Sequence, residues 1–85
     1  MANARIKDNP LNNISRKDIE EVIEQYIRDE DDRYMFTRYY LDGIAYEDIG
    51  QELDIPLSRQ AVSKRINKQY KVVIKHIINI NRTLW

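Results

Sequence analysis

The chain has 85 residues, 42% of them hydrophobic and 33% charged, and a formal net charge of zero, which predicts one small globular domain. It contains no cysteine and a single histidine, His76, so a disulfide framework, a thiolate nucleophile and a cysteine- or histidine-based metal site are excluded. No apolar run approaches the roughly 18–20 residues of a membrane span, and the N-terminus lacks the apolar core of a signal peptide. We therefore expect a cytoplasmic, non-enzymatic protein with no cofactor and no membrane partner.

The charge is divided into two blocks. Residues 1–57 contain seven Lys or Arg against 14 Asp or Glu, whereas residues 58–85 contain seven Lys or Arg and no acidic residue. The neutral total therefore combines an acidic N-terminal block with a basic C-terminal one. A neutral protein that concentrates its excess positive charge in one segment is expected to present that segment to a polyanion.

Residues 1–13 are polar and lack helical periodicity, which predicts a flexible N-terminal arm followed by a single domain over residues 14–85. A first helix begins after Ser15, whose hydroxyl can accept a backbone N–H, with Asp18 at the third helical position. Apolar residues then recur at the spacing of a buried helical stripe: Ile19, Val22, Ile23, Tyr26 and Ile27.

The acidic run 29–32 ends this helix, and its charge favours the N-terminus of the next helix through the helix dipole. Four adjacent carboxylates could bind a metal, but the run lacks the glycine and the alternating spacing of a calcium loop, so we predict no metal site. A second helix over residues 33–41 ends at Gly43, which supplies a left-handed residue. Its aromatic residues could stack on bases, but at helical spacing they predict core positions: Tyr34, Phe36, Tyr39 and Tyr40.

A short third helix is predicted over residues 45–53, followed by a turn at 54–57 in which Pro56 prevents a continuous helix. Ser58 then caps a long helix. One stripe of this helix is apolar, and it comprises Val62, Ile66, Tyr70, Val73, Ile77 and Ile80. The opposite stripe is basic, with Lys64, Lys68, Lys71 and Lys75. We find no strand pattern and predict an all-α fold of about four helices.

A short helix, a turn and a capped basic helix form a helix-turn-helix, here over residues 45–68, whose second helix enters the major groove of DNA. We expect four apolar residues to join its two helices: Ile49, Leu53, Val62 and Ile66. The candidates for base contacts are Gln60, Ser63, Lys64 and Asn67. The candidates for phosphate contacts are Arg59, Arg65, Lys68 and Lys71, with Lys75 further along the same face.

The segments Tyr39–Gly50 and Ser58–Ser63, with Leu53 between them, resemble region four of bacterial sigma factors. That region recognises the promoter −35 element and docks on the flap of RNA polymerase, so the resemblance, which covers roughly residues 31–72, implies a DNA-binding regulator from a bacterium, phage or mobile element. Similar segments occur in phage and plasmid regulators and in small terminase subunits.

The sequence departs from the family pattern in the turn region. Ala45 stands in place of the usual capping Ser or Thr, Asp54 stands in place of the usual turn glycine, and the turn is about two residues longer. The angle of the recognition helix therefore does not follow from the resemblance. No segment resembles the sigma region that melts promoter DNA, so we do not expect a complete sigma factor.

The helix extension over residues 69–84 continues an apolar seam spaced like that of a coiled coil. The seam could pack on the first helix or join two copies of the chain. We favour a homodimer, because a helix of about 36 Å is longer than a domain of this size needs, and Ile74 and Ile78 widen the stripe. The predicted dimer seam consists of Tyr70, Val73, Ile77, Ile80 and Leu84.

The sequence thus predicts a homodimeric regulator that binds specific double-stranded DNA through a helix-turn-helix. One alternative is a module that docks on RNA polymerase through the acidic half of the chain. Another is a small DNA-binding subunit of a phage packaging or replication complex. A basic amphipathic helix lying on an anionic membrane is disfavoured, because it would need neither the turn nor the capped segment after it.

Overall fold

The computed structural model describes residue 11 and residues 14–84, with side chains described through residue 77. It contains helices α1 (Arg16–Tyr26), α2 (Glu30–Tyr40), α3 (Tyr46–Glu52) and α4 (Arg59–Leu84). No strand occurs in this part of the chain, and the predicted all-α fold is confirmed. None of the helices over the described residues is long and apolar enough to cross a membrane.

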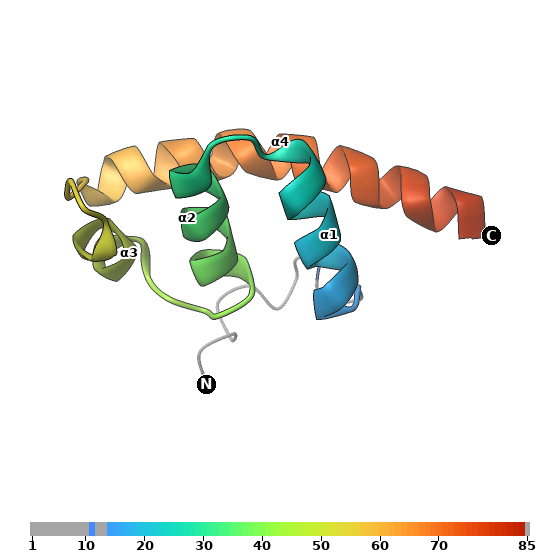
Figure 1. The fold of residues 1–85 in the computed structure, drawn as a ribbon, viewed down its shortest axis with the longest axis horizontal. Helices are drawn as coiled ribbons and strands as arrows, with labels where there is room; N and C mark the ends of the chain where they lie inside the picture. Colours follow the sequence, from blue (N-terminus) through green and yellow to red (C-terminus); the bar gives the residue numbers. More distant parts are fainter. Residues whose placement is uncertain (1–10, 12–13, 85) are drawn as a thin grey trace.

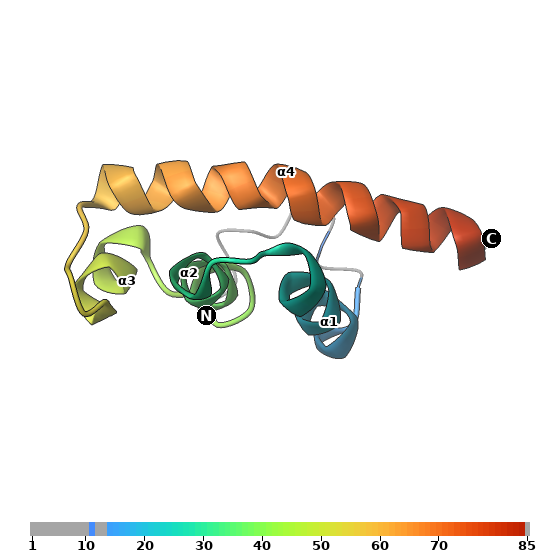
Figure 2. The same ribbon diagram turned by 45° about the horizontal axis from the view of Figure 1, so that its top comes forward.

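Helix α4 organises the fold. Its 26 residues extend for about 39 Å, and the three short helices lie beside one another along one of its faces (Figures 1 and 2). Helix α3 packs near the N-terminal end of α4, α2 packs at its middle and α1 packs further on, and each of the three contacts α4. The other described helices leave the opposite face of α4 uncovered.

The two predicted serine caps are confirmed. The hydroxyl of Ser15 accepts the backbone N–H of Asp18 at 3.2 Å, and the hydroxyl of Ser58 accepts the backbone N–H of Ala61 at 3.2 Å. Each bond satisfies one donor that the first turn of a helix leaves without an intrahelical partner. The local sequence therefore defines where α1 and α4 begin.

The predicted start of the second helix is wrong by one turn. Helix α2 begins at Glu30 because Asp29 acts as its N-cap and accepts the N–H of Asp32 at 3.0 Å. The acidic run is thus the first turn of α2 rather than a linker before it. The predicted helix stop is confirmed, since Gly43 has a φ of 73°, in the left-handed region.

The core lies between α4 and the three short helices. Its buried members are Leu11, Ile19, Val22, Ile23, Ile27, Met35, Phe36, Ile49, Val62, Ile66, Val73 and Ile77. Tyr26, which we placed in the buried stripe, is instead 42% exposed and stacks on His76 with ring centroids 3.5 Å apart. The predicted stripe of α1 is therefore correct for its four aliphatic residues and wrong for its tyrosine.

The predicted dimer seam belongs largely to this core. Val73 is fully buried and Ile77 is 3% exposed within a single chain. Tyr70 packs against the same core and stacks on Tyr40 of α2 at 5.4 Å. Val73 and Ile77 therefore have almost no exposed surface left to bury against a second copy, and Tyr70 is already partly covered by its own domain. The side chains of Ile80 and Leu84 lie outside the described residues.

The predicted arm lies mostly outside the described residues, but its residue Leu11 is 4% exposed and belongs to the core. The carbonyl of Leu11 accepts the N–H of Ile14 at 3.1 Å, in a short turn that precedes α1. The packed domain therefore includes at least one residue before its predicted boundary.

An ionic network joins α2 to α3. Arg38 donates to Glu52 at 2.8 Å and 2.9 Å and pairs with Asp42 at 3.2 Å, and the Tyr34 hydroxyl donates to Glu52 at 2.7 Å. The hydrogen bonds from Arg38, followed by that from Tyr34, lower the pKa of Glu52 to about 2. The C-terminal end of α3 is thereby held against α2.

Candidate nucleic-acid interface

The turn between α3 and α4 depends on a close backbone approach. The N–H of Leu57 donates to the carbonyl of Gly50 at 3.1 Å, and a Cβ on Gly50 would lie 2.2 Å from the Leu57 carbonyl oxygen. Only glycine fits this approach. Gly50 was not predicted to have a structural role, although a single glycine within a helical pattern can be a signal of tight packing.

The packing of α3 on α4 follows the prediction. Ile49 and Val62 are fully buried, Ile66 is 1% exposed, and Leu53 packs against them while partly buried. Because Val62 and Ile66 are turned towards α3, the side chains on the opposite side of α4 must face away from the domain. The apolar stripe of α4 therefore determines which side of the helix faces outward.

The outward side of α4 carries a basic stripe. Lys64, Lys68, Lys71 and Lys75 are spaced by four, three and four residues, and all are exposed. None of them has an acidic partner among the described residues, nor has the exposed Arg59. Charges without an internal partner remain available to an external anion. We call these five residues the free cations.

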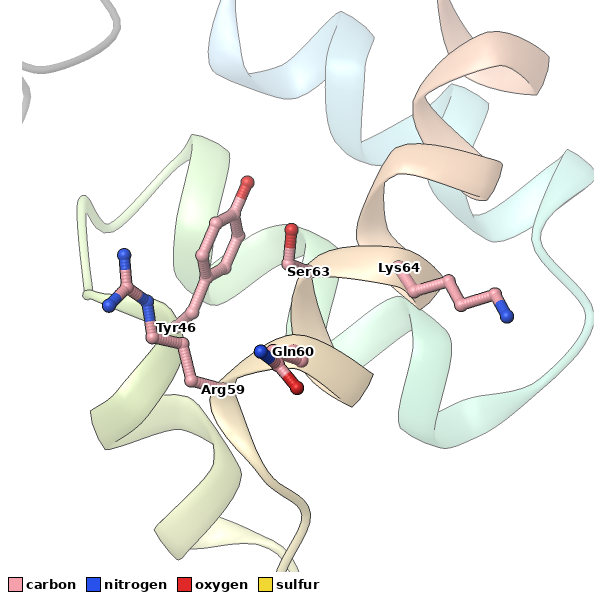
Figure 3. A pocket seen from close by; sticks show the side chains of 5 residues that line it. All are labelled: Tyr46, Arg59, Gln60, Ser63 and Lys64. Carbon is pink, nitrogen blue, oxygen red and sulfur yellow. The ribbon is translucent and has the colours of Figure 1, made fainter.

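The first two turns of α4 bring most of the predicted base-contacting residues to one hollow. This hollow is lined by Tyr46, Arg59, Gln60, Ser63 and Lys64 (Figure 3). Gln60 and Lys64 are exposed and Ser63 is half-buried. Asn67, one turn further on, is exposed and donates to the Ser63 hydroxyl at 3.4 Å. The structure thus places all four candidates on neighbouring turns of α4.

Tyr46 is the residue of this hollow that the sequence analysis did not single out. It opens α3 and stacks on Tyr39 with ring centroids 4.4 Å apart. Its hydroxyl and that of Ser63 point in the same direction (Figure 3). Burial, followed by hydrogen bonding to Tyr39, raises the pKa of Tyr46 to about 12, so its phenol stays protonated at neutral pH. A protonated phenol can donate to a phosphate or a base edge.

Two further hollows continue the first one. The hollow on the α3 side shares Tyr46 and Arg59 with it, and its lining is Tyr39, Ala45, Tyr46, Glu47 and Arg59. The hollow further along α4 shares Lys64 with it, and its lining is Lys64, Arg65, Asn67, Lys68 and Lys71. A shallow surface depression therefore runs from the start of α3 along the basic stripe.

Arg65 differs from the other predicted phosphate contacts. Its Nε atom lies 2.7 Å from Oδ1 of Asp32, and its Nη2 atom lies 3.3 Å from Oδ1 of Asp29. Asp32 belongs to the first turn of α2, and Asp29 is the N-cap residue that precedes it. The guanidinium is therefore engaged within the chain. Among the described residues, the other three predicted phosphate contacts, Arg59, Lys68 and Lys71, have no partner.

The described side chains include no group of three or more His, Asp or Glu placed to hold a metal ion. No family model matches the chain, and no curated protein or solved structure shows significant similarity to it. A functional interpretation therefore depends on the geometry and charge of this surface.

Proposed function

We propose that this protein binds double-stranded DNA by placing the outward face of α4 in the major groove. The observation that carries the proposal is the basic stripe, whose lysines have no acidic partner among the described residues although the first 57 residues contain 14 acidic ones. A helix is about 10–12 Å in diameter with its side chains, and the major groove is about 12 Å wide.

The free cations and the polar residues have different roles in this proposal. Gln60, Ser63, Lys64 and Asn67 read base edges from the first turns of α4, since amide and ammonium groups match the donors and acceptors that bases expose in the major groove. Phosphates are held without sequence preference by Arg59, Lys68 and Lys71, and by the Tyr46 hydroxyl at the border of the groove.

We further propose that the bound DNA is a regulatory site and that the protein is a transcriptional regulator. A homodimer on such a site would have to form through surfaces other than Tyr70, Val73 and Ile77, which the monomer buries or covers. Sedimentation of the protein at tens of micromolar, alone and with DNA, measures the number of copies directly.

A second candidate is docking on RNA polymerase. It is favoured by the exposed carboxylates of α1, Glu20, Glu21 and Glu24, which lie on the side of that helix turned away from its buried residues. In this case the acidic surface would contact a basic partner while α4 contacts DNA. A subunit of a packaging or replication complex would share the DNA contact but not the polymerase contact.

A gel-shift selection against genomic fragments, repeated with purified RNA polymerase, tests these proposals. We expect a retarded complex with the protein alone, and the double variant Lys64→Gln/Lys68→Gln should weaken it strongly. Lys17→Gln is the matched control, because Lys17 is an exposed, unpaired cation of α1 away from α4. Retardation only when polymerase is present would favour docking on the polymerase. If Lys17→Gln weakened DNA binding as much as Lys64→Gln/Lys68→Gln does, α4 would not be the helix that lies in the groove.

A further inference from the structure

Arg65 lies at the edge of the basic stripe but is bound to the acidic first turn of α2. Two of its nitrogen atoms contact Asp29 and Asp32, and the side chain of Asp32 is only 12% exposed. Oδ1 of Asp32 is buried without a well-aligned hydrogen bond, so the Arg65 guanidinium 2.7 Å away is the group that compensates its charge. The contact spans 33 residues of sequence and joins α4 directly to α2.

Gln69 extends the same contact by one helical turn. Its side-chain amide donates to Oδ2 of Asp32 at 2.9 Å, so Asp32 binds α4 through both of its carboxylate oxygens. Residues four apart lie on one side of a helix. Arg65 and Gln69 therefore form a polar row on α4 between its buried stripe and its basic stripe.

We infer that Arg65 is a positioning residue rather than a phosphate contact: by pairing with Asp32 it fixes the rotation of α4, and with it the side chains that face the DNA. This inference rests on the proposed DNA binding. The apolar stripe limits the rotation only coarsely, because packed aliphatic side chains have no directional bonds. Asp32 adds an ion pair to Arg65 on one carboxylate oxygen and a hydrogen bond from Gln69 on the other. A hydrogen bond depends on direction, and a rotation of α4 would lengthen one of the two contacts, so together they define the rotation more narrowly.

A double-mutant cycle between Arg65 and Asp32 distinguishes positioning from phosphate contact. The readout is the affinity for a selected site divided by the affinity for random DNA, measured well below the unfolding temperature. We expect Arg65→Gln and Asp32→Asn each to lower this ratio by about tenfold, in the range of couplings between residues in contact. The ratio of the double variant should fall by clearly less than the product of the two single losses, because both changes remove the Arg65–Asp32 contact.

Two control variants complete the design. Lys68→Gln removes an unpaired cation of the same helix, so it should weaken specific and random binding alike and reduce the salt slope by about 0.9. Asp31→Asn removes an exposed charge from the same turn of α2 as Asp32, and Asp31 has no partner among the described residues, so it should leave the ratio unchanged.

If Arg65→Gln instead behaved like Lys68→Gln while Asp32→Asn left the ratio unchanged, Arg65 would be a phosphate contact and the inference would be wrong. The positioning role would also be contradicted if the double variant lost as much of the affinity ratio as the two single variants lose together. If the wild-type protein bound no DNA at all, the proposed function itself would be wrong, and this outcome can be distinguished from the failure of the positioning role alone.

The proton on Nε of Arg65 provides a second readout. We expect its chemical shift to stay the same when DNA is added, and Asp32→Asn should move it in the free protein, because the group 2.7 Å away loses its charge. A signal that moved on DNA binding and became insensitive to Asp32→Asn in the complex would show that Arg65 leaves Asp32 for the DNA, and the positioning role would be excluded.

Discussion

The backbone of Gly50 touches the backbone of Leu57 across the turn that joins α3 to α4. The Leu57 N–H donates to the Gly50 carbonyl at 3.1 Å, and the position that a Cβ of residue 50 would occupy lies 2.2 Å from the Leu57 carbonyl oxygen. The chain can therefore leave α3 and enter α4 at this angle only while residue 50 has no side chain.

Gly50→Ala should destabilise the domain by about 1–3 kcal/mol, the usual cost of forcing an extra carbon into a packed site, because the new methyl group meets backbone and not a movable side chain. Urea unfolding followed by circular dichroism measures the change. Gln51→Ala, at the next and exposed position of α3, should leave stability within about 0.5 kcal/mol of the wild type. Equal stabilities of the two variants would contradict the close approach.

Ile77→Asp should unfold the monomer. Ile77 is 3% exposed, and an unpaired carboxylate in the core costs on the order of 4 kcal/mol, much of the stability of a small domain. Lys75→Asp introduces the same side chain at an exposed position and should stay folded. Thermal unfolding and sedimentation distinguish the outcomes: a helical Ile77→Asp protein of half the wild-type mass would restore the dimer seam.

Gln60→Ala or Lys64→Ala should cost about 1–3 kcal/mol on the selected DNA site and relax its sequence preference, because both side chains project from the first two turns of α4. Lys71→Ala should weaken selected and random DNA alike. Competition binding on a library of single-base variants measures both effects. A change of preference from Lys71→Ala, with none from Gln60→Ala, would show that the helix docks differently.

The affinity for DNA should fall steeply with salt. Three cations without a partner among the described residues are assigned to phosphates, namely Arg59, Lys68 and Lys71. With a slope of about −0.9 per neutralised phosphate, log K against log salt should have a slope of about −2.7 per chain. Titrations between about 50 and 200 mM salt measure it. A flat dependence would favour the protein-docking alternative.

Acid should destabilise the domain partly through Glu52. The pKa of Glu52 is about 2 in the folded state, below its ordinary value of 4.5. The ionised carboxylate therefore contributes fully to the free energy of unfolding above pH 4.5, and this contribution is lost as the pH falls towards 2. Glu52→Gln should therefore be less stable than the wild type at pH 6, and the difference should shrink towards pH 2. Unfolding free energies at pH 2–6 test this.

The control for the acid experiment is Glu24→Gln. Glu24 is an exposed residue of α1 whose carboxylate has no partner among the described residues, so this variant should keep the wild-type profile. If the two variants had the same profile, the Arg38–Glu52 contact would contribute nothing in solution.

Features determined by neighbouring residues could be predicted from the sequence. The caps at Ser15 and Ser58 and the left-handed glycine at 43 depend on one or two residues of local chain, and all three predictions are confirmed. The start of α2 was missed because Asp29 was interpreted as part of a charged run, although an aspartate is also among the best N-caps.

Features determined by distant residues could not be predicted in this way. The spacing of Val73 and Ile77 is the same whether they face a second copy or their own α1, so periodicity alone left both hypotheses open. The pairing of Arg65 with Asp32 joins two helices whose placement relative to one another no sequence pattern specifies. The spacing of the lysines predicted the basic stripe, whereas only the structure shows that the neighbouring Arg65 is already paired with acidic residues of its own chain.

The position of α4 in the chain has a consequence for biosynthesis. Helices α1, α2 and α3 all pack on α4, and they are translated before it. Until the residues up to Ile77 have left the ribosome, the apolar sides of the three short helices have no common surface to cover them. The domain should therefore acquire its structure in one cooperative step, at the moment when α4 becomes available to the three helices translated before it.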